Sequence, residues 1–532
     1  MAFNKRCSGV RHADCLEFLA RPQALHLRVP RQTLYGRNTL MPQILSSSLD
    51  VAAPSLPQHL VNECRKMPHS LFGVADRIVH ALGDRIRYVE NLKSWFGWDG
   101  RRWAEIPDNL APEAVQLLLA DLLPAEAKGF ADGDESKRAW RFVQEVHNRG
   151  LSGAMDLVAQ RKMMRVEPGS LNAMPELLNC ANGTVDLRTG RLVPHAQSHF
   201  FTMLVPVSYV EGAAPPEMWL RLLNDWCDGD AGKVAFLQRW CGYCLTGRTW
   251  AAKMLFLYGP GLNGKSIFVK VLRNVIGREL ASTFPSSLLM PAGRRGTQNE
   301  FGDDMKKAYA AFFGKRLMVS SEISEGSCFS DSRVKDLVST DELTGRFLHK
   351  NEFGFRPSHK IICMGNHKPR APEEASMESG FWRRMIFLQF PRVVENQIPE
   401  GRLFAMIERE YPAILAWMVA GAKEVLATED LGVTEEMKKD AESYRAESDV
   451  IGAFIEDRLV YDPGYDGDKL TQIRDAFAAW SEANGGEHLL RSPGALTRKL
   501  TERRYGGHKT ELVRPRVGKE RDRRLKGLRV RV

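Results

Sequence analysis

The sequence lacks a hydrophobic run that could span a bilayer. Its longest apolar stretch, about Ala413 to Ala422, is far shorter than the roughly 20 residues that a membrane helix needs. The amino end shows no basic segment followed by an apolar one, so we expect no secretory signal and a cytoplasmic location. Hydrophobic residues make up 43% and charged residues 26% of the 532 positions, which is ordinary for a globular protein of two to four domains.

The sequence also lacks a cysteine framework. Nine cysteines are scattered along the chain, and the one Cys-x-x-Cys pair is Cys241 and Cys244. A zinc site would need a second pair of ligands at a suitable spacing, and none is found. We therefore expect both thiols to be small apolar side chains buried in a helix.

Most of the chain has no excess of charge. The net charge is +10, but residues 491–532 alone carry fifteen Lys or Arg and four Asp or Glu, and the remainder is close to neutral. A basic end on a neutral body is the pattern expected for a polyanionic partner. Leucines and valines persist through this basic segment, which favours a folded nucleic-acid contact over a solvated tail.

The pattern of residues divides the chain into five regions. Prolines and serines without a period predict poor order near the amino end. Helical patterns follow, with short strands near 95–100 and 178–205 and a helical run from Glu217 to about Leu245. Apolar strands at 253–258, 316–321, 360–364 and 385–390 then alternate with helical segments, as in a parallel sheet. The expected regions are 1–68, 69–248, 249–395, 396–448 and 449–532.

The strongest motif is a phosphate-binding loop. It runs from an apolar strand into a helix and fits GxxxxGK[ST], with the residues Gly259, Pro260, Gly261, Leu262, Asn263, Gly264, Lys265 and Ser266. Glycines let backbone N–H groups converge on phosphate oxygens, and the helix start adds partial positive charge. Lys265 would reach the terminal phosphates of ATP, and the Ser266 hydroxyl would bind Mg²⁺.

Two later strands end in polar residues suited to nucleotide hydrolysis. Glu322 follows the strand that begins near Arg316, and an acid there can hold the Mg²⁺ shell or orient the attacking water. Asn366 follows the next strand and could contact the γ-phosphate or that water. Arg383 and Arg384 precede the fourth strand, and an arginine from a neighbouring subunit can stabilise the charge of phosphoryl transfer.

These motifs together resemble the superfamily 3 helicases, and in particular the primase–helicase proteins of phages, plasmids and poxviruses. The similarity extends from about residue 75 to 530. It includes WFGWDGRRW at 95–103, LLNCANGTVDLRTGRLVPH at 177–195, CGYCLTGRTW at 241–250 and FAAWSEANGG at 477–486. The resemblance implies an α/β P-loop core of the AAA+-like kind, a mostly helical N-terminal domain and a C-terminal winged helix.

The resemblance further implies a homo-hexameric ring that acts on DNA in a bacterial host cell. Lys265, Ser266, Glu322 and Asn366 would then act in their own subunit, and Arg383 or Arg384 in the neighbouring one. The family's channel hairpin corresponds to Gly345–Phe353, with His349 and Lys350 near the tip. Cations there could hold a DNA phosphate without reading sequence.

The chain departs from the family in two places. Ser339-Thr340-Asp341 stands where relatives often have Gly-Gly-Asp before the hairpin. The residues before the similarity begins are too few for a primase core and show no paired-acid site. We therefore expect no priming by this chain, and a separate primase or initiation protein as a partner.

The basic end is similar to the family's winged helix. Ser492 and Pro493 suit the start of a helix, whose continuation contains Arg498, Lys499 and, at its end, Arg503. These three cations are the expected phosphate contacts, and residues 509–531 would form the wing.

Three function classes fit the sequence to different degrees. An ATP-driven DNA helicase accounts for the loop, the two polar strand ends, the arginines and the basic end. An ATP-switched origin-binding or loading protein accounts for the basic end equally well. A small-molecule kinase accounts for the loop but not for the length, the arginine pair or the charge.

Overall fold

A computed structural model of the chain describes residues 56–531, apart from short gaps. The residues left out within that range are 91, 108–109, 132, 150–151, 292–297, 348–350, 373–379, 396–397, 485–492, 506–507, 514–515, 518–519 and 522. Residues 1–55 of the segment predicted to be poorly ordered lie outside the described residues. Residues 58–65 of the same segment form a helix with Leu60, Val61 and Cys64 buried, which is more order than the sequence predicted. Within the described part, no helix has both the length and the apolar character needed to cross a membrane.

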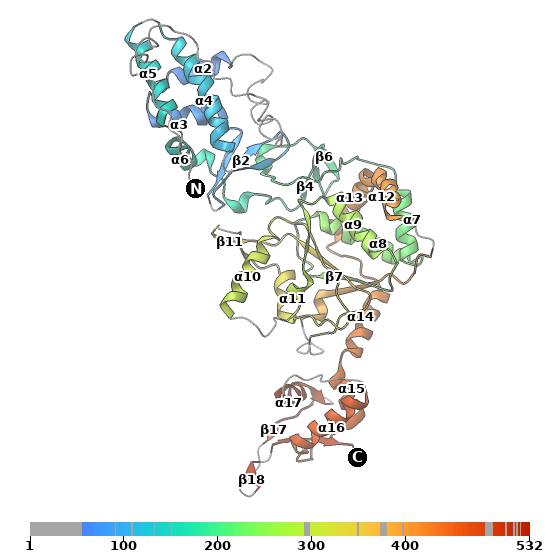
Figure 1. The fold of residues 1–532 in the computed structure, drawn as a ribbon. Coiled ribbons are helices and arrows are strands. Elements are labelled where there is room, and N and C mark those ends of the chain that lie inside the picture. Colours follow the sequence, from blue (N-terminus) through green and yellow to red (C-terminus); the bar gives the residue numbers. More distant parts are fainter. Residues whose placement is uncertain are drawn as a thin grey trace, which may run out of the picture.

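A helical module with a small antiparallel sheet comes first (Figure 1). Its elements are α2 (Gln58–Arg65), α3 (Leu71–Leu82), β1 (Ile86–Val89), β2 (Ser94–Trp98), β3 (Trp103–Ile106), α4 (Leu110–Lys128), α5 (Asp134–Arg149) and α6 (Ser152–Gln160). Ser70 begins α3 by accepting a hydrogen bond from the backbone of Gly73. The predicted strand–turn–strand around 95–100 is confirmed by the β2–β3 pairing.

A second antiparallel sheet and two helices connect this module to the central sheet. The sheet contains β4 (Leu177–Cys180), β5 (Gly183–Asp186) and β6 (Arg191–Val193), and the helices are α7 (Glu217–Trp226) and α8 (Ala231–Leu245). The predicted helix 217–245 is therefore wrong at its centre. Asp228 and Gly229 adopt positive φ angles of 54° and 78°, and Asp230 caps α8 by accepting from the Lys233 backbone.

The central sheet has five parallel strands in the order β13-β7-β12-β9-β8. They are β7 (Met254–Tyr258), β8 (Ala281–Phe284), β9 (Leu317–Ser320), β12 (Lys360–Met364) and β13 (Met385–Gln389). β7, β9, β12 and β13 are nearly continuous runs of buried side chains, as expected for strands covered on both faces. All carboxyl ends share one edge, which confirms the predicted parallel α/β sheet.

Helices that precede the sheet strands in the sequence and helices that follow them both pack around this sheet. α9 (Lys265–Ile276) follows β7, while α12 (Glu400–Ile407) and α13 (Tyr411–Thr428) come after β13. α8 and α13 lie backbone to backbone, because a Cβ on Gly242 would come within 2.1 Å of the Ala422 nitrogen. One core cluster joins residues from Leu178 in β4 to Met437 beyond α13.

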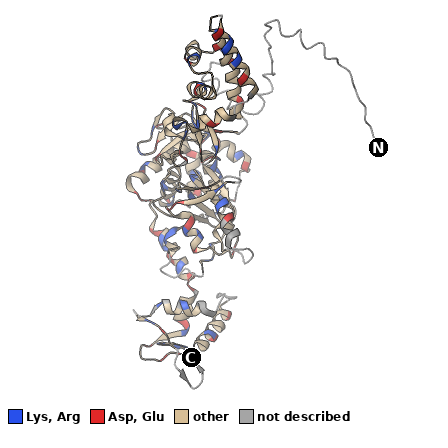
Figure 2. Ribbon diagram, turned by 90° about the vertical axis from the view of Figure 1, so that its left-hand side faces the viewer, with Lys and Arg blue, Asp and Glu red and all other residues tan. Residues whose placement is uncertain are grey.

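Two helices and a β-hairpin complete the middle of the chain. They are α10 (Gln298–Ala310), α11 (Asp331–Val338) and the hairpin of β10 (Leu343–Arg346) and β11 (Glu352–Phe355). Residues of α11 and of the hairpin share a core cluster with Met254 and Phe256 of β7, on the face of the sheet opposite α9 and α13. Figure 2 shows basic and acidic residues interspersed along the described helices here and in the N-terminal module, in keeping with a body of nearly balanced charge.

α14 (Glu435–Glu447) leads from the central sheet to a C-terminal domain (Figure 1). That domain contains α15 (Val450–Arg458), β14 (Leu459–Tyr461), α16 (Leu470–Ala483) and α17 (Pro493–Glu502). Its remaining strands are short: β15 (Arg504–Tyr505), β16 (His508–Lys509), β17 (Leu512–Val513), β18 (Arg516–Val517), β19 (Glu520–Arg521), β20 (Arg524–Leu525) and β21 (Leu528–Val530). It has a core of its own around Phe454, Ile473, Leu500 and Leu528. The predicted helix at 470–483 is confirmed.

Candidate nucleotide-binding site

The glycine-rich loop joins β7 to α9 at the carboxyl edge of the sheet. Gly259 has a φ of 144°, and a Cβ there would come within 2.2 Å of the Phe390 carbonyl oxygen. Gly264 has a φ of 87° and lies against the indole of Trp226. Only glycine fits both demands, positive φ and close approach, so the loop geometry depends on these two positions.

Lys265 begins α9 and turns its side chain back into the loop. Its Nζ donates to the carbonyl oxygens of Gly259 (2.8 Å) and Pro260 (3.2 Å) and to Oδ1 of Asn263 (2.9 Å). Burial lowers the pKa of Lys265, and the negative charge of Glu322 opposes that shift. The loop thus surrounds the Lys265 ammonium with the oxygens of Gly259, Pro260 and Asn263.

Asn263 and Asn366 fix the loop to the neighbouring strands. Asn263 Nδ2 donates to the carbonyl of Phe390 at the end of β13 (2.7 Å). The backbone nitrogen of Gly259 donates to the carbonyl of Asn366 (3.3 Å), and Asn366 Oδ1 lies 3.5 Å from the Lys265 amine. Asn366 therefore stands beside the loop, as its place after β12 predicted.

One cavity of about 730 Å³ contains most of the predicted residues. Gly261 to Ser266 line it together with Glu322 and Asn366. Ser266 and Glu322 offer oxygen ligands, the donor type that Mg²⁺ prefers, and the loop offers backbone N–H groups and an ammonium to phosphates. The residues present therefore fit a nucleotide with its magnesium ion.

The opposite wall of the cavity was not foreseen from the sequence. α7 contributes Leu222, Asp225 and Trp226, the segment after β13 contributes Val394, and α12 contributes Leu403. Asp225 forms an ion pair with Arg392 (2.7 Å) across this wall. No local motif marks α7 as part of the site, because it reaches the cavity only through packing against the loop.

The structure does not bring Arg383 and Arg384 to this cavity. They lie in a short 3₁₀ turn before β13, whose first residue pairs with Met254 at the start of β7. At about 3.3 Å per residue, the length of β7 puts the loop roughly 13 Å away along the strand. Arg384 Nη1 donates to the Gly380 carbonyl (2.7 Å) instead.

The predicted nucleic-acid contacts are placed only in part. His349 and Lys350 lie outside the described residues, between β10 and β11. Arg498 is exposed on α17, and Lys499 lies in the same helix, with a side chain outside the described part. Arg503 forms an ion pair with Asp449, the residue that caps α15, so this guanidinium contacts protein.

The Cys241 and Cys244 thiols are fully buried in α8. Burial raises the pKa of both thiols, that of Cys244 to about 12. Such thiols stay protonated at neutral pH and pack as apolar groups, in agreement with the structural interpretation of this pair.

Comparison with known proteins finds two matching families. A family described as D5 N terminal like matches residues 75–228, which supports the expected resemblance of the segment before the central sheet. A family of unknown function, DUF5906, matches residues 257–384, which contain the loop, Glu322 and Asn366. The two matches thus include the lining residues of α7 and of the loop, whereas the lining residues after β13 lie beyond both matches.

Similar curated proteins include proteins of two viruses. The chain is 22% identical over 346 residues to the "Putative primase" of African swine fever virus, from a Namibian warthog isolate, covering 59% of this chain and 34% of that protein. It is 20% identical over 318 residues to the "Putative helicase" of Acanthamoeba polyphaga mimivirus, covering 56% and 32%. The chain therefore spans about a third of the length of these relatives.

Among solved structures, the apo form of the NrS-1 C-terminal region matches 83% of this chain and 96% of its own length, at 12% identity and a TM-score of 0.44. Sequence and family comparisons together relate the chain to viral proteins that are named as a primase and as a helicase.

Proposed function

We propose that this protein is an ATP-dependent DNA helicase of replication, of the superfamily 3 type with an AAA+-like P-loop core. The observation that carries the proposal is the convergence of Lys265, Ser266, Glu322 and Asn366 on one cavity at the carboxyl edge of a parallel sheet. This edge is where open α/β sheets bind ligands. The similarity to viral replication proteins supports the same assignment.

Each residue has a role that its position allows. The loop backbone and the Lys265 ammonium would hold the β- and γ-phosphates of ATP. Ser266 and Glu322 would hold Mg²⁺, which neutralises phosphate charge when bound. Asn366, beside both Lys265 and Gly259, is suited to orient the attacking water. The apolar wall of Leu222, Trp226 and Val394 would take the base.

The arginines would complete the site from a neighbouring subunit. Arg383 and Arg384 lie at the amino edge of the sheet, so their own cavity is out of reach. A ring, with a hexamer as the expected size, would bring that edge of one subunit to the cavity of the next. An arginine supplied in this way is worth about 10³ to 10⁵ in turnover.

DNA would be held by the β10–β11 hairpin and by the C-terminal domain, which we propose to be a winged helix. Residues 491–532 hold the entire excess of positive charge, and phosphate contacts are the main source of affinity for DNA. Of the three cations predicted to contact phosphates, Arg498 is the one that the structure describes as exposed. A bacterial host cell remains the compartment in which we propose that the protein works.

The test is an ATPase and unwinding assay on forked DNA of both polarities. The expected result is ATP hydrolysis that DNA stimulates, with strand separation, and both are lost in Lys265→Ala. The loss should reach at least about 10²-fold, the usual effect of removing one group that stabilises transition-state charge. Folding of the variant is checked by its melting temperature, which should stay near the parent value.

The assay also separates the helicase from its alternative. The basic C-terminal domain suits an ATP-switched protein that binds or loads at an origin. Such a protein would give a sequence-specific footprint and nucleotide-dependent assembly, but no strand separation on any forked substrate. That result would replace the helicase assignment.

A further inference from the structure

Lys368 follows Asn366 by two residues and lies in a cage of aromatic rings. Its ammonium is 4.7 Å from the ring centre of Tyr258, 5.1 Å from that of Tyr444 and 5.8 Å from that of Phe387. Its Nζ also donates to Oδ1 of Asp440 at 2.5 Å. The side chain is only 17% exposed, so solvent screens this pair far less than an open surface pair.

Asp440 is shared by two residues that are close in sequence to the glycine-rich loop and to Asn366. Oδ1 accepts from Lys368, and Oδ2 accepts from the hydroxyl of Tyr258 at 2.7 Å. Burial and the neighbouring Asp440 raise the pKa of Tyr258, so the phenol remains a donor. Tyr258 immediately precedes Gly259, and Lys368 comes just after Asn366. One carboxylate thus binds the segments on both sides of the Gly259–Asn366 hydrogen bond.

That carboxylate belongs to α14, the helix that leads to the C-terminal domain (Figure 1). Tyr444, one turn further along α14, packs edge to face on Phe387 of β13 at 5.0 Å. Beyond the helix, Asp449 caps α15 and pairs with Arg503, which directly follows α17. The contacts therefore continue from the segments next to the loop and to Asn366, through α14, to the end of the helix proposed to contact DNA.

Another ion pair on α14 joins two residues of the same helix and serves as a comparison. Lys438 and Glu435 pair at 2.6 Å, but their side chains are 54% and 79% exposed and touch no other element through this pair. Exposed pairs of this kind contribute little. The Lys368–Asp440 pair differs because it is enclosed by rings from β7, β13 and α14 and joins separate parts of the fold.

We infer that Lys368, Asp440 and Tyr258 form a clamp that positions α14 according to the nucleotide in the cavity. If nucleotide in the cavity shifts Asn366 relative to Gly259, the distance between Lys368 Nζ and the Tyr258 hydroxyl changes. Both of these groups donate to the Asp440 carboxylate. α14 then moves, and the C-terminal domain moves with it. Lys368 is a positioning residue in this scheme, and the inference rests on the proposed function.

Hydrogen exchange along α14 is the direct measurement. The full-length protein is compared with and without a non-hydrolysable ATP analogue, for the parent and for Lys368→Met, which keeps an apolar chain inside the ring cage. Protection of residues 435–447 should change with the analogue in the parent and stay constant in Lys368→Met. Lys438→Met, on the same helix, should respond as the parent does.

Turnover gives a second readout. Stimulation of the ATPase by DNA should fall at least fivefold in Lys368→Met and in Asp440→Asn, with basal turnover within twofold of the parent. Lys368→Arg restores the charge and should recover stimulation. Equal melting temperatures of Lys368→Met and Lys438→Met separate positioning from a general loss of structure, and if Lys368→Met does not fold, Asp440→Asn and Tyr258→Phe take its place.

The outcomes distinguish the two proposals. If the parent binds no nucleotide, the proposed function fails and the clamp with it. If the parent binds and hydrolyses ATP while α14 protection does not respond, only the clamp fails. The clamp is also refuted if Lys368→Met keeps full DNA stimulation with normal α14 protection changes.

Discussion

Replacement of Gly264 by alanine tests the packing that builds the cavity. The added Cβ would lie 2.2 Å from Cε2 of Trp226, inside van der Waals contact, at a φ of 87°. Trp226 cannot turn aside easily, because it is 2% exposed and stacks on Phe390 at 6.1 Å while meeting Trp219 edge to face. The clash must therefore displace α7 or the loop.

The expected cost follows from two contributions. Overpacking of a filled site costs about 1–3 kcal/mol, and the left-handed conformation costs a non-glycine residue about 1–2 kcal/mol. Together they should lower the free energy of unfolding by about 2–5 kcal/mol. For a domain of this size each kcal/mol shifts the melting temperature by about 2–4 °C, so the expected decrease is about 4–20 °C.

Gly261 in the same loop is the matched control. A Cβ there meets no atom within 4 Å, and its φ is not in the positive region. Gly261→Ala should therefore change stability by less than about 1 kcal/mol. Thermal melting of both variants without nucleotide measures the difference. If Gly264→Ala and Gly261→Ala have the same melting temperature, the close approach of Trp226 to the loop is refuted.

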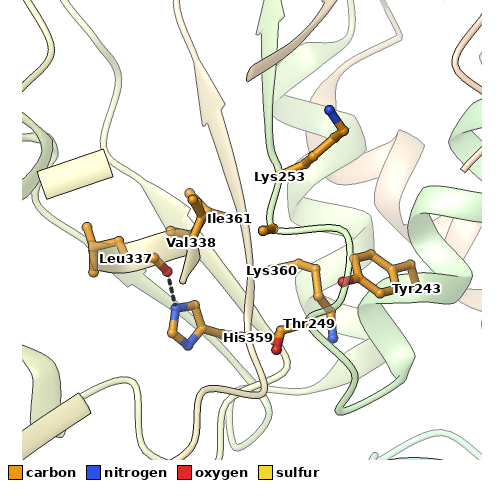
Figure 3. A pocket seen from close by; sticks show the side chains of 9 residues that line it. Tyr243, Thr249, Lys253, Leu337, Val338, His359, Lys360 and Ile361 are labelled. Carbon is orange, nitrogen blue, oxygen red and sulfur yellow. Dashed lines mark hydrogen bonds between the residues drawn. The ribbon is translucent and has the colours of Figure 1, made fainter. Parts of the chain in front are cut away.

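Two more predictions concern the arginine and a buried histidine. Arg384→Ala and Lys265→Ala should each abolish ATP turnover alone. An equal mixture of the two variants should regain part of it, because some subunit interfaces then pair an intact Lys265 with an intact Arg384. If mixed assemblies show no recovery, action of Arg384 in trans is excluded. Burial lowers the pKa of His359 to about 4, and its Nε2 contacts the Leu337 carbonyl (Figure 3). The unfolded chain, with a histidine pKa of about 6.5, binds more protons below that pH. The contribution of His359 to the free energy of unfolding is therefore fully present above pH 6.5 and falls towards pH 4 by up to about 3 kcal/mol. The melting temperature of His359→Gln, measured against pH, should decline less steeply than that of the parent. Identical curves would contradict a buried neutral imidazole at this position.

The sheet strands were predictable because their physics is local. Continuous apolar runs bounded by turn residues gave β7, β9, β12 and β13 nearly to the residue. β8 was missed because its centre, Ser282 and Thr283, is polar, and only its two end residues are buried. The break between α7 and α8 had a visible signal in Asp228-Gly229-Asp230, which a periodicity argument across the whole run passes over.

The candidate site divides in the same way. The loop, Glu322 and Asn366 could be found from the sequence because parallel strands bring their carboxyl ends to one edge. Trp226 and Asp225 could not, because they reach the cavity through tertiary packing of a helix that carries no motif. The roles of Arg384, His349 and Lys350 depend on a neighbouring subunit or on DNA, so these residues remain predictions.

The apolar stretch around Ala413 to Ala422 shows why the cavity needs more than the sheet. In the structure it lies within α13, which is buried along its length against α8 and α9. Gly421 and Gly242 allow the α8 and α13 backbones to meet, since a Cβ on Gly421 would come within 2.2 Å of the Gln238 carbonyl oxygen. A helix before the sheet is thereby locked to one after it. Two groups of cavity-lining residues come from these same flanks: Leu222, Asp225 and Trp226 of α7, which precedes α8, and residues between Val394 and Leu403 that lead into α12. Ile414, Leu415 and Met418 of this apolar run belong to the same core cluster as Trp226 and Leu403. The run that is too short for a membrane therefore joins the two flanks that supply these lining residues.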